Sequence, residues 1–397
     1  MVLCYLTIMK FFLLFFSGFV LGQSRAQNGN TTYLMGRTSG PLPYLEYGLG
    51  DDRLGGAKMG YLDSGVVIKV VDSVKEDYKV QLSRNHYAYL PKVNFMPDDT
   101  TILQPYYLTS SWKVYGEEKY DYVTVNLDER LPYRSIQQIN PSKIIVDVFG
   151  ATSNTNWITQ LSTAKEIQNV YPEQIEDDVF RILIELKHPQ HWGYFIYYQQ
   201  NILTIRIKRQ PEKLKTKNLF IAIDAGHGGT NNGATGVASQ ILEKDYTLKI
   251  AKELEKYFLK KKMKVFMTRN EDTELTMIDR TLMLREQDPD ILVSIHLNSS
   301  GKPEIKGVST YYRYIGFRPL SQAILGKMLE LKLEEFGNIG SFNFTLSGPT
   351  EYPNCLVEVA FLSNTDDEKR ILSSKFHKDV AKKIYDGIDE WVKGMKQ

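Results

Sequence analysis

The sequence contains little cysteine and almost no net charge. Only 2 of its 397 residues are cysteines, and one of them, Cys4, lies in an apolar N-terminal leader. If the leader is cleaved near Ala26, Cys355 is the only cysteine left, and no intramolecular disulfide can form. The formal net charge is +2, so no overall field favours nucleic acid or an anionic membrane as a partner.

The apolar run of the leader is short. It extends from Phe11 to Phe19 after Lys10, whereas a membrane-spanning helix needs about 20 apolar residues. A lysine, an apolar run and then small or polar residues are typical of a secretory signal peptide. The apolar residues before Lys10 leave an uncleaved anchor as the alternative. We predict a signal peptide over residues 1–26, export to the periplasm or cell envelope, and no stable membrane span after cleavage.

The composition of the next part of the chain indicates β structure. With 42% hydrophobic and 12% aromatic residues, the whole sequence can form folded cores. Residues 27–50 are rich in Gly, Asn, Ser and Thr, which predicts a flexible leader. Runs such as "GVVIKVVDS" predict a small β module over residues 51–98, and alternating runs such as "SKIIVDVFG" predict a second all-β module over residues 105–208.

Strands alternate with helices in the last part of the chain, from residue 218 to 397. Apolar residues at helical spacing predict helices near 244–262, 276–287, 318–336 and 375–392. The predicted strands are "LFIAI", "KVFMT", "DILVSI", "GVSTYY" and "CLVEVAFL". This alternation predicts an α/β domain with a mainly parallel sheet flanked by helices, preceded by one or two small all-β modules.

Four polar residues lie at or beside the predicted strand ends, where ligands gather in open α/β sheets. His227 follows "LFIAID" between two glycines, His296 ends "ILVSIH", Glu358 lies in "CLVEVAF", and Glu243 opens the first helix. Glycines beside His227 let the backbone turn sharply and leave the imidazole accessible. Two histidines and one glutamate, with a fourth position open for water, form a known type of catalytic zinc site.

Each candidate also has a structural explanation. A histidine can lie exposed in a glycine-rich turn or be hydrogen-bonded at a strand end. An acidic residue in the first turn of a helix, such as Glu243, stabilises the helix dipole. Glu358 can instead form an ion pair with Arg280 or Arg285. The zinc site is excluded only if the structural explanations of His227, Glu243 and His296 are all correct at once. This favours the zinc site.

Four segments resemble, in order, the zinc-dependent N-acetylmuramoyl-L-alanine amidase family, which cleaves peptidoglycan. They are "DAGHGGTNNGATG", "EKDYTL", "SIHLNSS" and "LVEVAFLSN", and the resemblance covers roughly residues 218–394. It implies that His227, Glu243 and His296 bind a Zn²⁺ cofactor and that Glu358 is the catalytic carboxylate. Family members often have proline after the first aspartate of these segments, where this chain has an alanine that is not among the ligands.

The resemblance also implies the reaction. Zinc-activated water would hydrolyse the amide bond between the lactyl group of N-acetylmuramic acid and L-alanine of the peptidoglycan stem peptide, in wall remodelling, cell separation or turnover. Glu358 would pass the proton of the water to the departing amine. Peptidoglycan is the expected partner, nucleic acid is not, and any activator protein is unknown. The alternatives are a catalytically inactive peptidoglycan-binding protein and a zinc hydrolase of another peptide or amide.

The two β modules have weaker resemblances. The module over residues 51–98 resembles bacterial SH3-like domains, and the module over residues 105–208 resembles the AMIN domains that accompany such amidases and bind the cell wall. Their many tyrosines can stack on sugars, although aromatic residues in short strands more often belong to a core or a sheet surface. On the resemblance to AMIN domains, we expect the second module to bind the cell wall.

Overall fold

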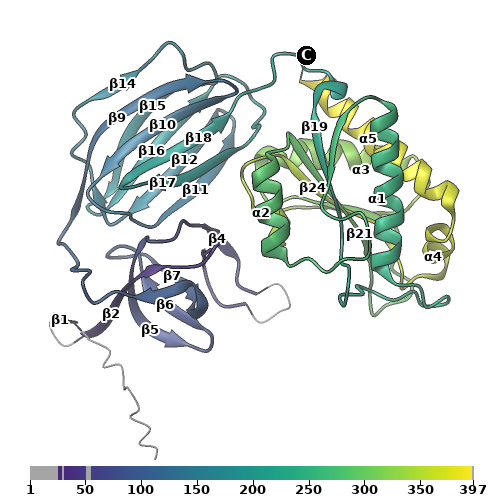
Figure 1. Cartoon of the computed structure of the whole chain (residues 1–397), viewed down its shortest axis with the longest axis horizontal. Helices are drawn as coiled ribbons and strands as arrows, with labels where there is room; N and C mark the ends of the chain where they lie inside the picture. Colours follow the sequence, from purple (N-terminus) through teal and green to yellow (C-terminus); the bar gives the residue numbers. More distant parts are fainter. Residues whose placement is uncertain (1–25, 29–30, 51–54, 396–397) are drawn as a thin grey trace, which may run out of the picture.

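The computed structural model describes residues 26–28, 31–50 and 55–395. The predicted signal peptide lies outside these residues, apart from Ala26. Figure 1 shows three groups of elements: an N-terminal β module (described residues up to 97), a second β module (residues 107–208), and an α/β unit (residues 220–394) that lies beside the other two. Among the described residues, no helix is long and apolar enough to cross a membrane.

The N-terminal module is an antiparallel sheet. Its strands are β1 (Ala26–Asn28), β2 (Thr31–Thr38), β3 (Tyr44–Glu46), β4 (Lys58–Tyr61), β5 (Val67–Val74), β6 (Asp77–Gln81), β7 (Tyr87–Pro91) and β8 (Phe95–Pro97). Their order is β1-β2-β5-β6-β7-β3-β4, and β8 pairs with β2. A single 3₁₀ turn, η1 (Lys92–Asn94), joins β7 to β8.

The prediction of a flexible leader over residues 27–50 is wrong for most of its length. β2 pairs with β5, and β3 pairs with β4 and β7, so both strands belong to the sheet. Leu42 and Leu45 are buried, and Leu45 is part of the main β core. The polar composition did not reveal these strands because backbone pairing with later segments, rather than local pattern, holds them in place.

The second module consists of two sheets that share one core. Its strands are β9 (Tyr107–Glu117), β10 (Tyr120–Leu127), β11 (Tyr133–Ile139), β12 (Ser142–Phe149), β13 (Ala151–Thr152), β14 (Ile158–Gln160), β15 (Ile167–Glu176), β16 (Val179–Leu186), β17 (Tyr194–Gln199) and β18 (Ile202–Lys208). One sheet has the order β13-β9-β10-β18-β17, with β14 also on β9, and the other has the order β11-β12-β16-β15. Val123 on β10 and Val146 on β12 are buried in the same apolar cluster.

The α/β unit is built on one six-stranded sheet of order β20-β19-β21-β24-β22-β23. Its strands are β19 (Phe220–Ala225), β20 (Lys264–Met267), β21 (Ile291–Asn298), β22 (Val308–Tyr311), β23 (Glu335–Ile339) and β24 (Asn354–Phe361). Every neighbouring pair is parallel except β22 with β24. All six residues of β19 are buried, as expected for a strand covered by helices on both faces.

Helices cover both faces of this sheet (Figure 1). They are α1 (Glu243–Lys260), α2 (Met277–Gln287), α3 (Arg318–Leu329), α4 (Thr365–Ile371) and α5 (Ser374–Gly394), with 3₁₀ turns η2 (Thr216–Asn218), η3 (Ile315–Phe317) and η4 (Thr345–Ser347). α1, α3 and α5 contribute to one large core, whereas Leu284 of α2 packs in a separate cluster on the opposite face. α2 starts where the sequence predicts because Thr276 forms a capping box with Asp279.

Three elements of the α/β unit differ from the prediction. The helix expected over 318–336 ends at Leu329, and Lys332 follows in a left-handed conformation with φ of 59°. Residues 335–339 then form β23, because they pair with β22 at the edge of the sheet. The short helix α4 was not predicted, since seven residues give little periodicity.

The second module packs tightly against the α/β unit. Trp192 belongs to the core of the α/β unit, and its ring centroid lies 5.1 Å from that of Trp391 on α5. Lys208 is 4% exposed, and its Nζ lies 2.8 Å from a carboxylate oxygen of Asp288. Gln190 Nε2 donates to the backbone oxygen of Gly316 at 2.7 Å. These buried contacts hold the second module and the α/β unit in one arrangement.

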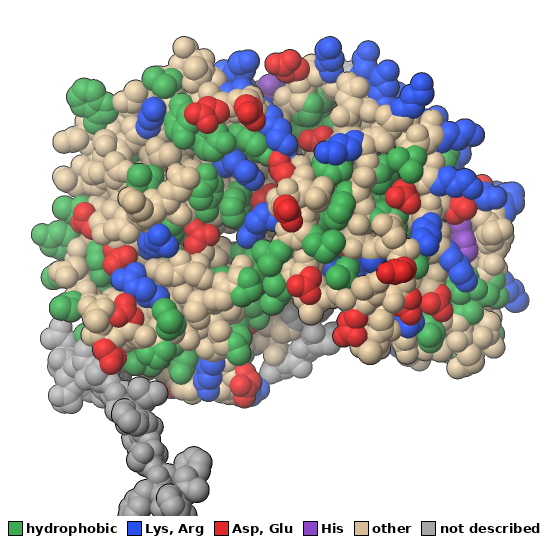
Figure 2. Space-filling view, viewed as in Figure 1, with side chains coloured by type: hydrophobic (Ala, Val, Ile, Leu, Met, Phe, Trp, Pro, Cys, Tyr) green, Lys and Arg blue, Asp and Glu red, His purple; other side chains and the backbone are tan. Residues whose placement is uncertain are grey.

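Positive charge is unevenly distributed although the net charge is small. Figure 2 shows Lys and Arg side chains gathered along the outer rim of the α/β unit, over α1 and α5. On α1 the exposed lysines include Lys249, Lys252 and Lys256, opposite the buried face that carries Ile250 and Leu254. This pattern is that of an amphipathic helix whose polar face is solvated.

Candidate metal centre and active site

The four residues singled out in the sequence come together at one end of the α/β sheet. His227 follows the carboxyl end of β19, His296 lies near the end of β21, and Glu243 is the first residue of α1. Glu358 of β24 is the register partner of His296 in the parallel pair β21–β24. This is the edge where the loops of an open α/β sheet converge.

The glycines around His227 are required by close approaches. A Cβ atom at Gly226 would lie 2.4 Å from Cε1 of His296, and one at Gly233 would lie 2.5 Å from Oε2 of Glu243. His227 itself has φ of 63°, a left-handed conformation that is uncommon for a residue with a side chain. The glycine-rich loop therefore folds back over the other two residues and carries the imidazole to them.

His227, Glu243 and His296 form a compact cluster. Oε1 of Glu243 lies 3.0 Å from Nε2 of His227 and 3.1 Å from Nδ1 of His296. The two imidazole ring centroids are 5.0 Å apart. One ligand atom from each of the three residues lies within 4.8 Å of the other two, so the cluster can hold a metal ion.

Backbone groups orient the glutamate of this cluster. The amide of Leu297 donates to Oε1 of Glu243 at 3.0 Å, and the amide of Ala234 donates to Oε2 at 2.8 Å. Glu243 is 4% exposed and His296 is 7% exposed. Because a buried carboxylate needs compensating donors, these contacts fix its orientation.

The electrostatics favour the ionised glutamate. Burial raises the pKa of Glu243, but hydrogen bonds and Coulomb attraction from His227 and His296 outweigh burial, so the pKa lies well below its usual range. Burial lowers the pKa of His227, and the contacts with Glu243 and Asn231 outweigh it, so that pKa is raised. The cluster thus keeps its one carboxylate in the anionic form that binds metals.

A second set of residues supports His227. Nδ1 of its ring lies 2.9 Å from Oδ1 of Asn231. Nη2 of Arg280 donates to the backbone oxygen of His227 at 2.6 Å, and Nη1 forms an ion pair with Asp224 at 2.6 Å. Contacts of this kind fix ring orientation in metal sites. Sequence reasoning missed Asn231 and Asp224, although both lie within the quoted glycine-rich segment.

The two arginines considered as partners of Glu358 bind other carboxylates. Arg280 pairs with Asp224 at 2.6 Å, and Nε of Arg285 lies 2.8 Å from Oε1 of Glu351. Glu358 is half-buried and lines the same cleft as the metal-binding cluster. Its position therefore allows it to act on a molecule bound there.

The cleft has a volume of about 580 Å³ and is lined by all four residues. Its other walls include Asn298 and Ser299 at the end of β21, Phe342 and Phe344 before η4, and Lys58 from the N-terminal module. Phe344 packs edge to face on the ring of His296, with centroids 5.5 Å apart. The volume lies in the range of sites that bind small molecules.

The donor set fits a transition metal. Two imidazoles and one carboxylate converge, which is a ligand set of catalytic metal sites that keep one position open. Within the described part of the chain, Nε2 of His296 is buried and has no hydrogen-bond partner. The cluster thus has a donor atom that no described protein group satisfies.

Comparisons with known proteins identify two regions of the chain. Residues 221–390 match the family described as N-acetylmuramoyl-L-alanine amidase, and residues 113–207 match the AMIN domain.

Curated relatives cover different shares of the chain. The probable cell wall amidase LytH of Staphylococcus epidermidis is 31% identical over 176 residues, which are 44% of this chain and 59% of that protein. The N-acetylmuramoyl-L-alanine amidase AmiC of Neisseria meningitidis serogroup B is 24% identical over 370 residues, covering 70% of this chain and 89% of that protein. The chain thus spans less than two thirds of LytH and most of AmiC.

A solved structure is similar to part of the chain. The crystal structure of N-acetylmuramoyl-L-alanine amidase from Clostridium difficile 630 is 30% identical, with a TM-score of 0.43, and the match covers 45% of this chain and 98% of that chain.

Proposed function

Because the chain belongs to the N-acetylmuramoyl-L-alanine amidase family through residues 221–390, we propose that it hydrolyses the amide bond between the lactyl group of N-acetylmuramic acid and L-alanine of the peptidoglycan stem peptide. The observation that carries the proposal is the convergence of three candidate metal ligands and one carboxylate in a single cleft. A cleft of about 580 Å³ accommodates the two groups on either side of the scissile bond.

The proposed cofactor is Zn²⁺, held by His227, Glu243 and His296. When bound, zinc polarises a carbonyl group and makes water more acidic. The backbone amides on Glu243 and the contact of Asn231 with His227 keep these ligands in place. Two neutral nitrogen donors and one anionic oxygen donor support zinc over magnesium or calcium, which prefer oxygen ligands.

Glu358 is the proposed general base and acid. One of its carboxylate oxygens accepts a proton from the attacking water, and the oxygen of that water forms a bond with the carbonyl carbon. The C–N bond then breaks, and the proton passes from Glu358 to the nitrogen of L-alanine. The second proton of that water passes from the new carboxyl group to the departing amine, so the products are a lactyl carboxylate and a peptide with an ammonium group at its amino terminus, and atoms and charges balance.

The rest of the chain supports an envelope location. We propose cleavage of a signal peptide over residues 1–26 and action on the wall from the periplasm or cell envelope. The proposed division of the chain is an SH3-like module over residues 51–98, extended toward the N-terminus by β2 and β3, an AMIN-like wall-binding module over residues 105–208 and a catalytic domain over residues 218–397. The AMIN match over residues 113–207 supports the wall-binding role.

Product analysis tests the reaction. Purified peptidoglycan is incubated with the full-length protein, with the protein after chelation, and with the chelated protein after zinc is restored. We expect released peptides with new L-alanine amino termini, no new reducing sugar ends, and loss of release after chelation. New reducing ends would mean a glycosidase, and cuts within the stem peptide would mean a peptidase. Binding to the wall without any release would mean an inactive binding protein.

A further inference from the structure

A lysine from the N-terminal module lines the candidate active site. Lys58 begins β4, far in sequence from the α/β unit, yet it lies on the wall of the cleft that contains His227, Glu243 and Glu358. Among the described residues that line this cleft, Lys58 is the one lysine or arginine. The cleft therefore combines a carboxylate-rich end with a single fixed cation on its wall.

Hydrogen bonds fix the backbone of Lys58 at the wall of the cleft. Its amide donates to Oδ1 of Asn343 at 3.1 Å, and Nδ2 of Asn343 donates to the backbone oxygen of Gly56 at 2.7 Å. Arg313 donates both to Oδ1 of Asn343, at 3.0 Å, and to the backbone oxygen of Lys58. Asn343 lies between the two phenylalanines that line the cleft, so the N-terminal module is joined to the active-site wall.

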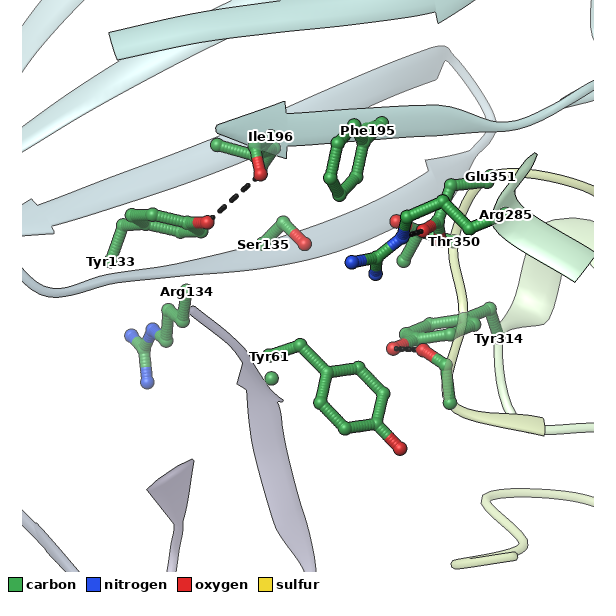
Figure 3. Close-up of a pocket in the computed structure, with 12 residues that line it drawn as sticks. Tyr61, Tyr133, Arg134, Ser135, Phe195, Ile196, Arg285, Tyr314, Thr350 and Glu351 are labelled. Atoms are coloured by element: carbon green, nitrogen blue, oxygen red, sulfur yellow. Dashed lines mark hydrogen bonds and ion pairs between the residues drawn. The ribbon is translucent and has the colours of Figure 1, made fainter. Parts of the chain in front are cut away.

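Contacts of Tyr61, further along β4, with the α/β unit restrict movement of this strand. Figure 3 shows Tyr61 of β4 facing Tyr314 and the Arg285–Glu351 ion pair of the α/β unit, beneath strands of the second module. The hydroxyl of Tyr61 donates to the backbone oxygen of Thr345 at 3.3 Å. The pocket between these residues has a volume of only about 40 Å³. Because three parts of the chain close on this point, Lys58 has little freedom to leave the cleft.

The ammonium group of Lys58 lies over an aromatic ring rather than against a carboxylate. Its Nζ lies 4.9 Å from the centroid of the Tyr44 ring, and no described carboxylate forms an ion pair with it. Burial lowers the pKa of Lys58 below its ordinary value; the carboxylate of Glu46, the register partner of Lys58 on β3, opposes this shift, and the guanidinium of Arg313 adds to it. A partly desolvated ammonium without an ion-pair partner gains strongly when a carboxylate reaches it.

We propose that Lys58 binds a carboxylate of the stem peptide while the scissile amide lies at the metal-binding cluster. The proposal rests on the amidase function and adds a substrate-binding residue that lies outside the catalytic domain. It gives the N-terminal module a role in substrate selection, because without that module the cleft loses its cation. A peptide whose carboxylates are amidated would lose this contact.

Steady-state kinetics of the full-length protein on two soluble substrates test the proposal. One is a synthetic N-acetylmuramoyl stem peptide with free carboxylates, and the other is the same molecule with every carboxylate converted to a primary amide. Lys58→Met removes the charge and keeps an unbranched side chain on Tyr44, whereas Lys58→Arg keeps the charge. Lys79→Met is the matched control, since Lys79 lies 5.1 Å from the ring of Tyr87 in the same module and does not line the cleft.

We expect Lys58→Met to lower kcat/KM for the acidic substrate by roughly 10- to 100-fold, mainly through KM, as for loss of a hydrogen bond between charged groups. For the amidated substrate the change should stay within about twofold, and Lys58→Arg should keep most of the preference. The Lys79→Met protein should match the wild type on both substrates.

The outcomes separate this proposal from the amidase function. If Lys58→Met lowers kcat/KM equally for both substrates while thermal unfolding is unchanged, Lys58 only supports the wall of the cleft. If Lys58→Met lowers kcat/KM for neither substrate, Lys58 does not bind the substrate. Both results overturn the inference while leaving the amidase intact. If Lys58→Met does not fold, failure of Lys58→Arg to prefer the acidic substrate also overturns it. Absence of cleavage of either substrate by the zinc-loaded wild type would instead refute the proposed function.

Discussion

Replacement of Arg280 by methionine tests how the loop that carries His227 is held. Arg280 is 1% exposed, and its guanidinium forms a 2.6 Å ion pair with Asp224, which is also 1% exposed. It also donates to the backbone oxygens of Ala225 at 2.8 Å and His227 at 2.6 Å. Arg280→Met preserves much of the apolar volume but leaves a buried carboxylate without its ion-pair partner and the backbone oxygen of His227 without this donor, whereas the oxygen of Ala225 still accepts from Nε of Arg269 at 2.9 Å.

The expected cost follows from this geometry. Removing one partner of a buried ion pair typically costs about 3–5 kcal/mol. The hydroxyls of Thr268 and Ser294 still donate to Asp224, at 2.7 and 2.6 Å, which favours the lower end of that range. Since about 1.4 kcal/mol is a factor of ten, amide exchange in β19 and β21 should accelerate by roughly two to three powers of ten.

The assay is hydrogen exchange followed by mass spectrometry on peptides that cover β19 and β21. Arg84→Met is the control, because Arg84 forms an ion pair with Asp177 at the surface, where the side chains are 70% and 84% exposed. Surface pairs contribute about 0–1 kcal/mol, so its exchange should change by less than about fivefold. Equal exchange rates in the two variants would refute the buried-pair argument.

The same pair predicts a pH dependence of defined sign. Burial raises the pKa of Asp224, but Arg280 and the two hydroxyls outweigh it, so the pKa in the folded protein lies below its usual value. A carboxyl group whose pKa is lower in the folded protein than in the unfolded chain stabilises the fold at pH values above the pKa of the unfolded chain, which is about 3.9. This stabilisation is lost as the pH falls through the pKa of the folded protein. In Arg280→Met that pKa rises, so the difference in stability between wild type and variant should shrink as the pH falls from about 7 toward 4. A difference that grows would contradict this assignment.

Three further predictions concern the metal, the base and the module interface. His296→Ala should lose most bound zinc in elemental analysis, because one of three protein ligands is gone, and full occupancy would exclude His296 as a ligand. Glu358→Gln should keep zinc and lose about 100- to 10,000-fold in kcat, because an amide does not accept the proton; near-wild-type turnover on muropeptides would assign Glu358 a structural role only. A fragment that starts at Lys217 lacks Trp192, which packs on Trp391 with ring centroids 5.1 Å apart. By scanning calorimetry its unfolding midpoint should lie below that of the α/β unit in the full chain, and an unchanged midpoint would show that the interface adds no stability.

Much of the α/β unit was predictable because its signals are local. The buried run of β19, the helical spacing of Ile250, Leu254 and Phe258 on α1, and the capping box at Thr276 are each contained in a short segment. β2, β3 and β23 were missed because they are strands only through pairing with distant segments. The amino-acid composition of these three strands is typical of a loop or a helix.

The sequence by itself predicted the residues of the candidate site. Short motifs predicted two histidines and a glutamate at or near strands and a second glutamate at a helix start, and the structure brings His227, Glu243, His296 and Glu358 to one cleft. Only the tertiary structure decided what surrounds them. Lys58 reaches the cleft through a contact with Asn343 across 285 residues of sequence. Local periodicity determines which face of a strand or helix is buried, but the packing of whole modules determines which side chains meet from opposite ends of the chain.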